Sequence, residues 1–267
     1  MLLFPLMGYS QSCHFEADQY AFINDQAQAV IVLGHGLNTN TKVMFPLGEK
    51  LCERGASVFM NRLKGHYGKN SLRDLKTVKA EEWVHDLKIA VDRAKVWSDA
   101  KQVSRLYFIG FSLSSLLGEV EQQRSAVFSK LVHLAPPFET KDLSRLSTLF
   151  LLPDSLVIPS ANLKAYRANT GVPINAYRQL FKLQDEFNAK AFQDETPRLV
   201  FLEKDDELVS FNKSVKRLLS VPHLTIKKID KSSDAKQFPH HLVVDQYTLG
   251  ASTFQSLIQE ISQFLEL

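Results

Sequence analysis

The sequence is poor in the features that mark several large classes of protein. Among its 267 residues there are only two cysteines, Cys13 and Cys52, which are too few for a disulfide framework. No cysteine and histidine residues recur at the spacing of a zinc site. No apolar run approaches the roughly 20 residues that cross a bilayer as a helix. The sequence therefore excludes a disulfide-stapled mini-protein, a zinc module and a chain with a transmembrane span.

The sequence also lacks a large excess of charge of one sign. The net charge is only +3, and no long basic block occurs, so a nucleic-acid partner is not expected. The richest cationic cluster is interpreted as a solvated loop and helix face rather than an anion site. It consists of Lys64, Lys69, Arg73, Lys76 and Lys79.

The amino-terminal stretch MLLFPLMGYSQSC leaves two interpretations open. It is apolar and then small and polar, as a signal peptide is near its cleavage site, but it lacks a basic start and its apolar part is short. The stretch is either the remnant of an export signal or a first strand. The compartment is therefore open, with the cytoplasm as the default.

The composition and the pattern of the remaining chain predict one α/β domain. With 45% hydrophobic residues the chain is long enough for one sizeable core. Strand-like apolar segments alternate with amphipathic helical ones, which predicts a mostly parallel sheet flanked by helices. The expected strands are 27–36, 56–63, 103–110, 130–137, 197–203 and 224–230. The expected helices are 43–55, 83–97, a helix after Ser112, 176–192 and a closing helix with Phe254, Leu257, Ile261 and Leu265.

The alternation breaks between residues 138 and 195. We interpret this segment as a lid or cap inserted over one end of the sheet, so that 1–137 and 196–267 form the core. Its apolar residues either line an acyl pocket or simply pack the insertion onto the sheet. These residues are Leu149, Phe150, Leu151, Leu152, Leu156, Val157 and Ile158.

The segment LYFIGFSLSSLLGE places Ser112 between small residues where a strand gives way to a helix. A tight turn of this kind projects a serine hydroxyl beyond the carboxyl end of the strand, where ligands of parallel sheets bind. A helix N-cap serine is the alternative interpretation. Gly110 meets the need for a small residue two positions before the serine, and Ser114 stands where a second glycine is usual.

A glycine turn follows the first predicted strand, in LGHGLNTN. Acyl transfer needs N–H donors aimed at a developing oxyanion. We assign these donors to the backbone N–H groups of Leu37 and Leu113. His35 is expected to support the loop by hydrogen bonding rather than to act as a base.

Acidic and basic candidates follow two later strands. Asp205 and Asp206 lie just past the predicted strand 197–203, and His240 and His241 follow 224–230. A serine needs a base to take its proton and an acid to orient the base. The residues alone leave each pair open.

The chain resembles the α/β-hydrolases, in particular carboxylesterases and monoacylglycerol-lipase-like enzymes, over residues 27–267. The resemblance rests on the order serine, acid, histidine and on the segments VIVLGHGL, MFPLGEKLCERGASVFMNRLKGH, WVHDL, IGFSLSSLLG, KDDELV and PHHLVVD. It favours Asp206 as the acid, because the four residues that begin with Asp206 fit the family pattern Asp-x-apolar-Val. Asp205 is the alternative. The resemblance favours His240 as the base, five positions before Asp245, with His241 as the alternative. Gly65-His66 matches a structural turn of the family, whereas Ser114 departs from its last elbow glycine.

The resemblance implies a serine hydrolase that cleaves short or medium acyl esters through an acyl-enzyme, without a metal or an organic cofactor. The expected partner is a small ester, lipid-like esters included, and the oligomeric state stays open. Thioester or peptide hydrolysis needs the same triad. A non-catalytic binding protein on the same scaffold is a further alternative, supported only by Ser114.

Overall fold

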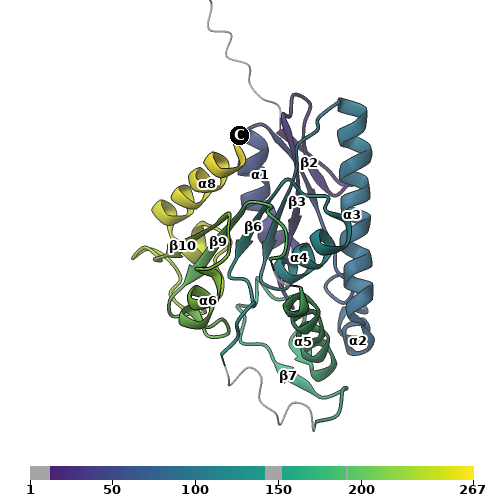
Figure 1. Ribbon diagram of the computed structural model, residues 1–267. Helices are drawn as coiled ribbons and strands as arrows, with labels where there is room; N and C mark the ends of the chain where they lie inside the picture. Colours follow the sequence, from purple (N-terminus) through teal and green to yellow (C-terminus); the bar gives the residue numbers. More distant parts are fainter. Residues whose placement is uncertain (1–12, 142–151, 191) are drawn as a thin grey trace, which may run out of the picture.

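The computed structural model describes residues 13–141, 152–190 and 192–267 (Figure 1). Its centre is an eight-stranded sheet with the order β1-β2-β4-β3-β5-β6-β9-β10. Strands β4 to β10 of this order run parallel, whereas β1 and β2 are antiparallel to their neighbours. The strands are β1 (Cys13–Glu16), β2 (Ala21–Asn24), β3 (Ala29–Gly34), β4 (Ala56–Met60), β5 (Leu106–Phe111), β6 (Lys130–Leu134), β9 (Arg198–Glu203) and β10 (Leu224–Ile229).

The six strands expected from the sequence form the parallel part of this sheet. Strands β3, β4, β5 and β9 are buried along their whole length, because helices cover both faces. Burial on both faces explains why their sequences are continuous apolar runs without alternation. The α/β fold class with a mostly parallel sheet is therefore confirmed.

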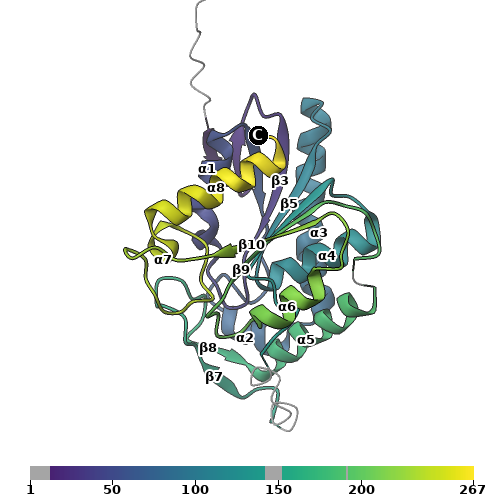
Figure 2. The same cartoon turned by 60° about the vertical axis from the view of Figure 1, so that its left-hand side comes forward.

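The helices cover the two faces of the sheet in separate sets (Figures 1 and 2). Leu47 and Leu51 of α1 share one hydrophobic cluster with Leu257 and Ile261 of α8. Helices α3, α4, α5 and α6 contribute to the cluster on the opposite face. The helices are η1 (Thr41–Met44), α1 (Phe45–Glu53), α2 (Ser71–Thr77), α3 (Ala80–Lys101), α4 (Leu113–Ser125), α5 (Ile174–Ala189), α6 (Phe211–Leu218), α7 (Gln246–Leu249) and α8 (Ala251–Leu265). Within the three described ranges, no helix is both long and apolar enough to cross a membrane.

The β1–β2 hairpin at the sheet edge was not expected from the sequence. Cys13 at the start of β1 forms a disulfide with Cys52 in α1, with the two Cα atoms 5.8 Å apart. The bond joins the edge strand to a helix on one face of the sheet. Residues 1–12, for which an export-signal remnant and a first strand were both considered, lie outside the described residues.

The predicted insertion contains a two-stranded antiparallel sheet and a helix. Strands β7 (Val157–Pro159) and β8 (Gly171–Pro173) pair with each other, and α5 follows directly. These elements lie together at one end of the main sheet (Figures 1 and 2). Leu149, Phe150 and Leu151 lie outside the described residues. That the insertion acts as a lid stays a prediction.

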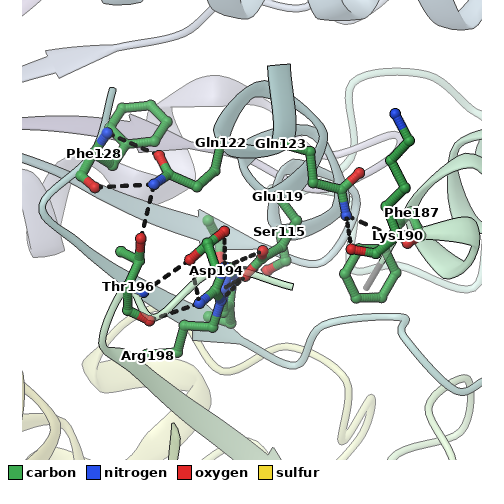
Figure 3. Close-up of polar contacts among 12 residues, drawn as sticks. Ser115, Glu119, Gln122, Gln123, Phe128, Phe187, Lys190, Asp194, Thr196 and Arg198 are labelled. Atoms are coloured by element: carbon green, nitrogen blue, oxygen red, sulfur yellow. Dashed lines mark hydrogen bonds and ion pairs between the residues drawn. The ribbon is translucent and has the colours of Figure 1, made fainter. Parts of the chain in front are cut away.

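Helix α4 is fixed to the sheet by a buried ionic cluster (Figure 3). The Arg198 Nε and Nη2 groups on β9 donate to the two carboxylate oxygens of Glu119 on α4, at 2.8 and 3.0 Å. Both side chains are fully buried. Arg198 also pairs with Asp194 at 3.0 Å, and His133 Nε2 on β6 lies 2.7 Å from Glu119 Oε1. Burial alone would raise the pKa of Glu119, but His133 and Arg198 hold it below its ordinary value.

The far end of α4 also contacts the insertion. The Gln123 side-chain amide donates to the backbone carbonyls of Phe187 and Lys190, at 3.4 and 3.1 Å (Figure 3). Phe187 lies in the last turn of α5, and Lys190 follows the end of the helix. Helix α4 therefore connects β9 to α5, and its first residue follows Ser112 directly.

Candidate active site

Ser112 lies in a strained turn between β5 and α4. Its φ is 49° and its ψ is −118°, a region that residues other than glycine rarely adopt. The Ser112 N–H donates to the Leu134 carbonyl on β6 at 2.9 Å, which holds the turn against the sheet. A side chain at Gly110 would place its Cβ 2.7 Å from the Ser115 nitrogen, so the turn requires glycine there. Ser112 makes no side-chain cap hydrogen bond, which argues against the simple N-cap interpretation.

Ser114, which replaces the usual glycine, has a partner of its own. Its buried hydroxyl donates to the His35 carbonyl at 2.6 Å. The Asn61 side-chain amide lies 3.4 Å from the same oxygen. The hydroxyl therefore joins the first turn of α4 to the loop after β3, and the departure from glycine does not open the turn.

His241, and not His240, lies against Ser112. His241 Nε2 is 2.8 Å from Ser112 Oγ, and His241 Nδ1 is 2.7 Å from Asp206 Oδ2. The His240 ring faces a different carboxylate, with Nδ1 3.4 Å from Glu203 Oε1. The preference for His240 from its spacing to Asp245 is therefore corrected in favour of the alternative. The two histidines are adjacent in the chain, and only the second has its ring directed into the site.

Asp206, which the family resemblance favours, is the carboxylate that the structure brings to His241, and Asp205 is exposed. Asp206 Oδ1 accepts hydrogen bonds from the backbone N–H groups of Leu208 and Val209, at 2.8 and 2.9 Å. Burial alone would raise the pKa of Asp206, but His241 and these N–H groups keep it below its ordinary value. Burial alone would lower the pKa of His241, but Asp206 and Glu207 raise it above its ordinary value.

The backbone N–H groups of Leu37 and Leu113 have no hydrogen-bond acceptor within the described part of the chain. Leu113 is the first residue of α4, where N–H groups have no partner inside the helix. Leu37 lines the same cavity as Ser112, and Leu113 follows Ser112 directly in the chain. A Cβ on Gly36 would lie 3.1 Å from the Ser112 Cβ, so glycine lets this loop approach the serine. This arrangement is compatible with the assigned oxyanion donors.

Two buried histidines support the loop that carries Leu37. His35 Nδ1 lies 3.0 Å from the Gly36 carbonyl, and the Leu63 N–H donates to His35 Nε2 at 3.3 Å. The Asn38 N–H donates to His66 Nε2 at 2.9 Å. Burial lowers the pKa of His35 to about 3 and that of His66 to about 4, so both rings are neutral acceptors at neutral pH.

His66 and the insertion hold the loop in ways that sequence reasoning missed. Asn38 has a φ of 53°, and its side-chain oxygen accepts from the Asn169 N–H at 2.8 Å. The Asn169 side-chain amide donates to the Gly65 carbonyl at 2.9 Å. The family resemblance indicates only that the Gly65-His66 turn is structural. Its position beside the loop depends on contacts far apart in the chain, which the sequence did not indicate.

A cavity lies over Ser112 and His241 and is lined mainly by apolar side chains. The insertion contributes one wall, but with other residues than those expected: Leu152, Leu156, Val157 and Ile158 do not line it. Apart from His241, none of the lining residues carries an ionisable acid or base other than the phenol of Tyr177. The lining residues are Leu37, Asn38, Thr39, Phe111, Ser112, Pro137, Thr140, Ser160, Ala161, Asn162, Val172, Tyr177, Leu180, Phe181, Leu208 and His241.

The described ranges contain no group of three or more histidine, cysteine, aspartate or glutamate side chains that could hold a metal ion. The arrangement instead offers a hydroxyl, an imidazole and a carboxylate in series beside unpaired N–H groups. Such a series can activate a serine for attack on a carbonyl carbon.

This fold and this site define the chain as an α/β-hydrolase. The model of the family described as serine aminopeptidase, S33, matches residues 25–233. The chain belongs to this family, and the family and fold make it a hydrolase. A comparison with curated proteins found no match.

Solved structures with the same fold include lipolytic enzymes. A structure from work on LipS and LipT, two metagenome-derived lipolytic enzymes, has a TM-score of 0.72 at 15% identity, with 95% of this chain and 99% of that chain covered. A soluble variant of monoglyceride lipase from Saccharomyces cerevisiae, in complex with a substrate analog, has a TM-score of 0.69 at 14% identity, with 98% and 97% covered. The monoacylglycerol lipase of Paleococcus ferrophilus has a TM-score of 0.62 at 15% identity, with 88% and 93% covered.

Proposed function

We propose that the protein is a serine hydrolase of carboxylic esters that acts through Ser112, His241 and Asp206. The observation that carries the proposal is the series of contacts from Ser112 Oγ to His241 and on to Asp206, at 2.8 and 2.7 Å. Those distances are within the reach needed for proton transfer from a nucleophile to a base that a third group orients.

The reaction has two steps in this proposal. Ser112 Oγ attacks the acyl carbon while His241 Nε2 takes its proton, and Asp206 stabilises the resulting imidazolium. The Leu37 and Leu113 N–H groups donate to the oxyanion, and His241 then gives its proton to the departing alcohol. In the second step a water molecule attacks the acyl-enzyme, with His241 again as base, and Ser112 and the acid are released.

The cavity favours an uncharged ester over a peptide amino terminus. An ammonium group held in an apolar cavity needs a carboxylate partner, and none of the described lining residues carries one. The family name describes aminopeptidases, whereas the solved structures with this fold include a monoglyceride lipase with a substrate analog. We therefore propose short or medium acyl esters, lipid-like esters included, as substrates.

Turnover of a panel of nitrophenyl esters of increasing acyl length tests the proposal. We expect wild-type turnover, and a loss of about 10³-fold or more in kcat for Ser112→Ala. Acyl-CoA thioesters and aminoacyl nitroanilides serve as comparison substrates for the thioesterase and peptidase alternatives. Intact-mass measurement after treatment with a fluorophosphonate should show one added phosphonyl group, which Ser112→Ala lacks. Wild-type protein that neither turns over any ester nor takes up the label would contradict the proposal.

A further inference from the structure

Two successive acidic residues after β9 contact the segment that carries His241, in different ways. Asp206 contacts the His241 ring, as described above. The Glu207 carboxylate accepts two backbone hydrogen bonds: Oε1 from the His240 N–H at 2.8 Å, and Oε2 from the His241 N–H at 3.0 Å. One carboxylate therefore binds two consecutive peptide N–H groups, one with each oxygen.

The segment between β10 and α7 has no helix or strand of its own around His241 (Figure 2). Backbone hydrogen bonds hold the first part of the segment, such as that from the Lys236 N–H to the Tyr247 carbonyl at 2.8 Å, whereas side chains hold residues 239–241. On the amino-terminal side, the Lys231 ammonium group donates to the Pro239 carbonyl at 2.9 Å, and Glu207 holds the next two N–H groups. On the other side, the chain continues into the buried residues Leu242 and Val243. From outside this segment, the Glu207 carboxylate binds the His241 peptide N–H directly.

We propose that Glu207 is a positioning residue: by holding the His240 and His241 N–H groups, its carboxylate places the His241 ring between Asp206 and Ser112. The inference rests on the function proposed above. It does not make Glu207 a catalytic residue, because Glu207 touches neither Ser112 nor the His241 ring. Charge-assisted hydrogen bonds to N–H groups are shorter and stronger than neutral ones, which suits a group that must hold a loop without secondary structure.

The charge of Glu207 has a second effect on the same ring. The charged groups that act on His241 are Asp206 and Glu207, which favour the imidazolium, and Lys231, which disfavours it. Removal of the Glu207 charge should therefore lower the pKa of His241. Because the reaction needs the neutral ring as base, activity should then persist to lower pH than in the wild-type enzyme.

Two substitutions separate the effect of the Glu207 hydrogen bonds from the effect of its charge. Glu207→Ala removes both hydrogen bonds and the charge. Glu207→Gln removes the charge but keeps one acceptor oxygen, and its NH₂ group faces the second N–H. We expect kcat for a nitrophenyl ester to fall by roughly 10- to 100-fold in Glu207→Ala and by less in Glu207→Gln, with KM within about threefold of wild type. Both variants should show the same shift of the acidic limb of kcat/KM to lower pH.

Asp230→Asn is the matched control. Asp230 is an exposed acid at the end of the neighbouring strand β10, paired with Lys228, and its removal takes away one negative charge at the same sheet edge. We expect it to leave kcat and the pH profile unchanged. Circular dichroism and the melting temperature show which variants fold, and Glu207→Gln carries the test if Glu207→Ala does not fold.

The His241 Nδ1 proton gives a readout that is independent of turnover. In wild-type protein the short contact to Asp206 should produce a downfield proton signal, which Glu207→Ala should weaken or shift. An active wild type with an inactive Ser112→Ala, together with a Glu207→Ala variant that keeps wild-type kcat, pH profile and proton signal, would overturn the positioning role alone. A wild type without ester turnover would instead overturn the proposed function.

Discussion

His240 and His241 are neighbours in the chain, yet their rings face different carboxylates. His241 contacts Asp206 and Ser112, whereas His240 lies beside Glu203 at the end of β9. The spacing of both histidines to the apolar segment that follows is compatible with either role. The direction of each ring depends on how Glu207 holds the backbone, and such a contact across the fold leaves no local pattern in the sequence.

Exchange of each histidine should separate the two roles. We expect His241→Ala to lower kcat by about 10³-fold or more, since no other base reaches Ser112 among the described residues. His240→Asn should keep kcat within about tenfold of wild type, because its ring does not contact the serine. Steady-state kinetics on one nitrophenyl ester measure both. Equal losses in the two variants would contradict the assignment.

Ser114 illustrates how a departure from a family pattern can be compensated locally. Sequence reasoning identified the missing glycine but not the use of the hydroxyl, because its acceptor, the His35 carbonyl, lies 79 positions away in the chain. The elbow residues Gly110 and Ser112 were predictable, since the turn itself restricts which residues fit.

Removal of the Ser114 hydroxyl should destabilise the protein. Ser114→Ala leaves the buried His35 carbonyl without this donor, and an unsatisfied buried acceptor costs about 1–3 kcal/mol. Ser114→Gly, which restores the family residue, should cost at least as much because glycine also weakens the first turn of α4. Urea unfolding measures both. An increase in the free energy of unfolding for Ser114→Gly would show that the hydroxyl does not stabilise this site.

At the scale of elements, α4 fixes the serine turn relative to the sheet. Its first residue follows Ser112, and its middle is fixed to β9 by Glu119 and Arg198. The sequence predicted the helix from its place after the serine turn, but the buried charged residues were not recognised as a pair. Their separation of 79 positions is set by the parallel sheet and not by any local pattern.

The buried pair should be sensitive to the loss of one partner. Among the described residues, Glu119→Gln leaves the Arg198 guanidinium with Asp194 as its one charged partner, and breaking a buried pair costs about 3–5 kcal/mol. Asp92→Asn on the exposed face of α3 removes a solvent-exposed pair with Lys88 and serves as the control. We expect no measurable change in unfolding for the control. Similar unfolding curves for both variants would contradict a structural role for the buried cluster.

The edge hairpin shows where prediction of elements from the sequence ends. The parallel strands were predictable because burial on both faces requires continuous apolar runs. Strand β2 has only four residues, all buried, and β1 is half-exposed, so neither has a distinct period. Their pairing depends on the contact of β2 with β4, which is a property of the whole sheet.

At the scale of the whole molecule, the pH dependence of activity should follow one histidine. The pKa of His241 is raised above its ordinary value of 6.5 by its carboxylate neighbours, against the effect of burial. Since the reaction needs the neutral ring, kcat/KM should fall as the pH is lowered through a pKa above 6.5. His35 and His66, with pKa values of about 3 and 4, stay neutral there. A pH–rate profile tests this, and an acidic limb centred well below 6 would contradict it.

The disulfide between Cys13 and Cys52 should contribute to stability without affecting turnover. It closes a loop with a sequence separation of 39, and a bond of this kind typically contributes about 2–4 kcal/mol. The double variant Cys13→Ser, Cys52→Ser should therefore unfold at lower urea concentration, with kcat unchanged because neither residue lines the cavity. A fall in kcat together with the loss of stability would show that the edge hairpin affects the active site.

The disulfide at the edge of the sheet also gives information on the compartment in which the protein resides. Such bonds persist in oxidising compartments and are rare where glutathione keeps thiols reduced. Thiol alkylation of protein taken directly from its native cells would reveal whether both sulfurs are blocked. Full protection from the reagent would place the working enzyme outside the reducing cytosol, and two modified cysteines would place it inside.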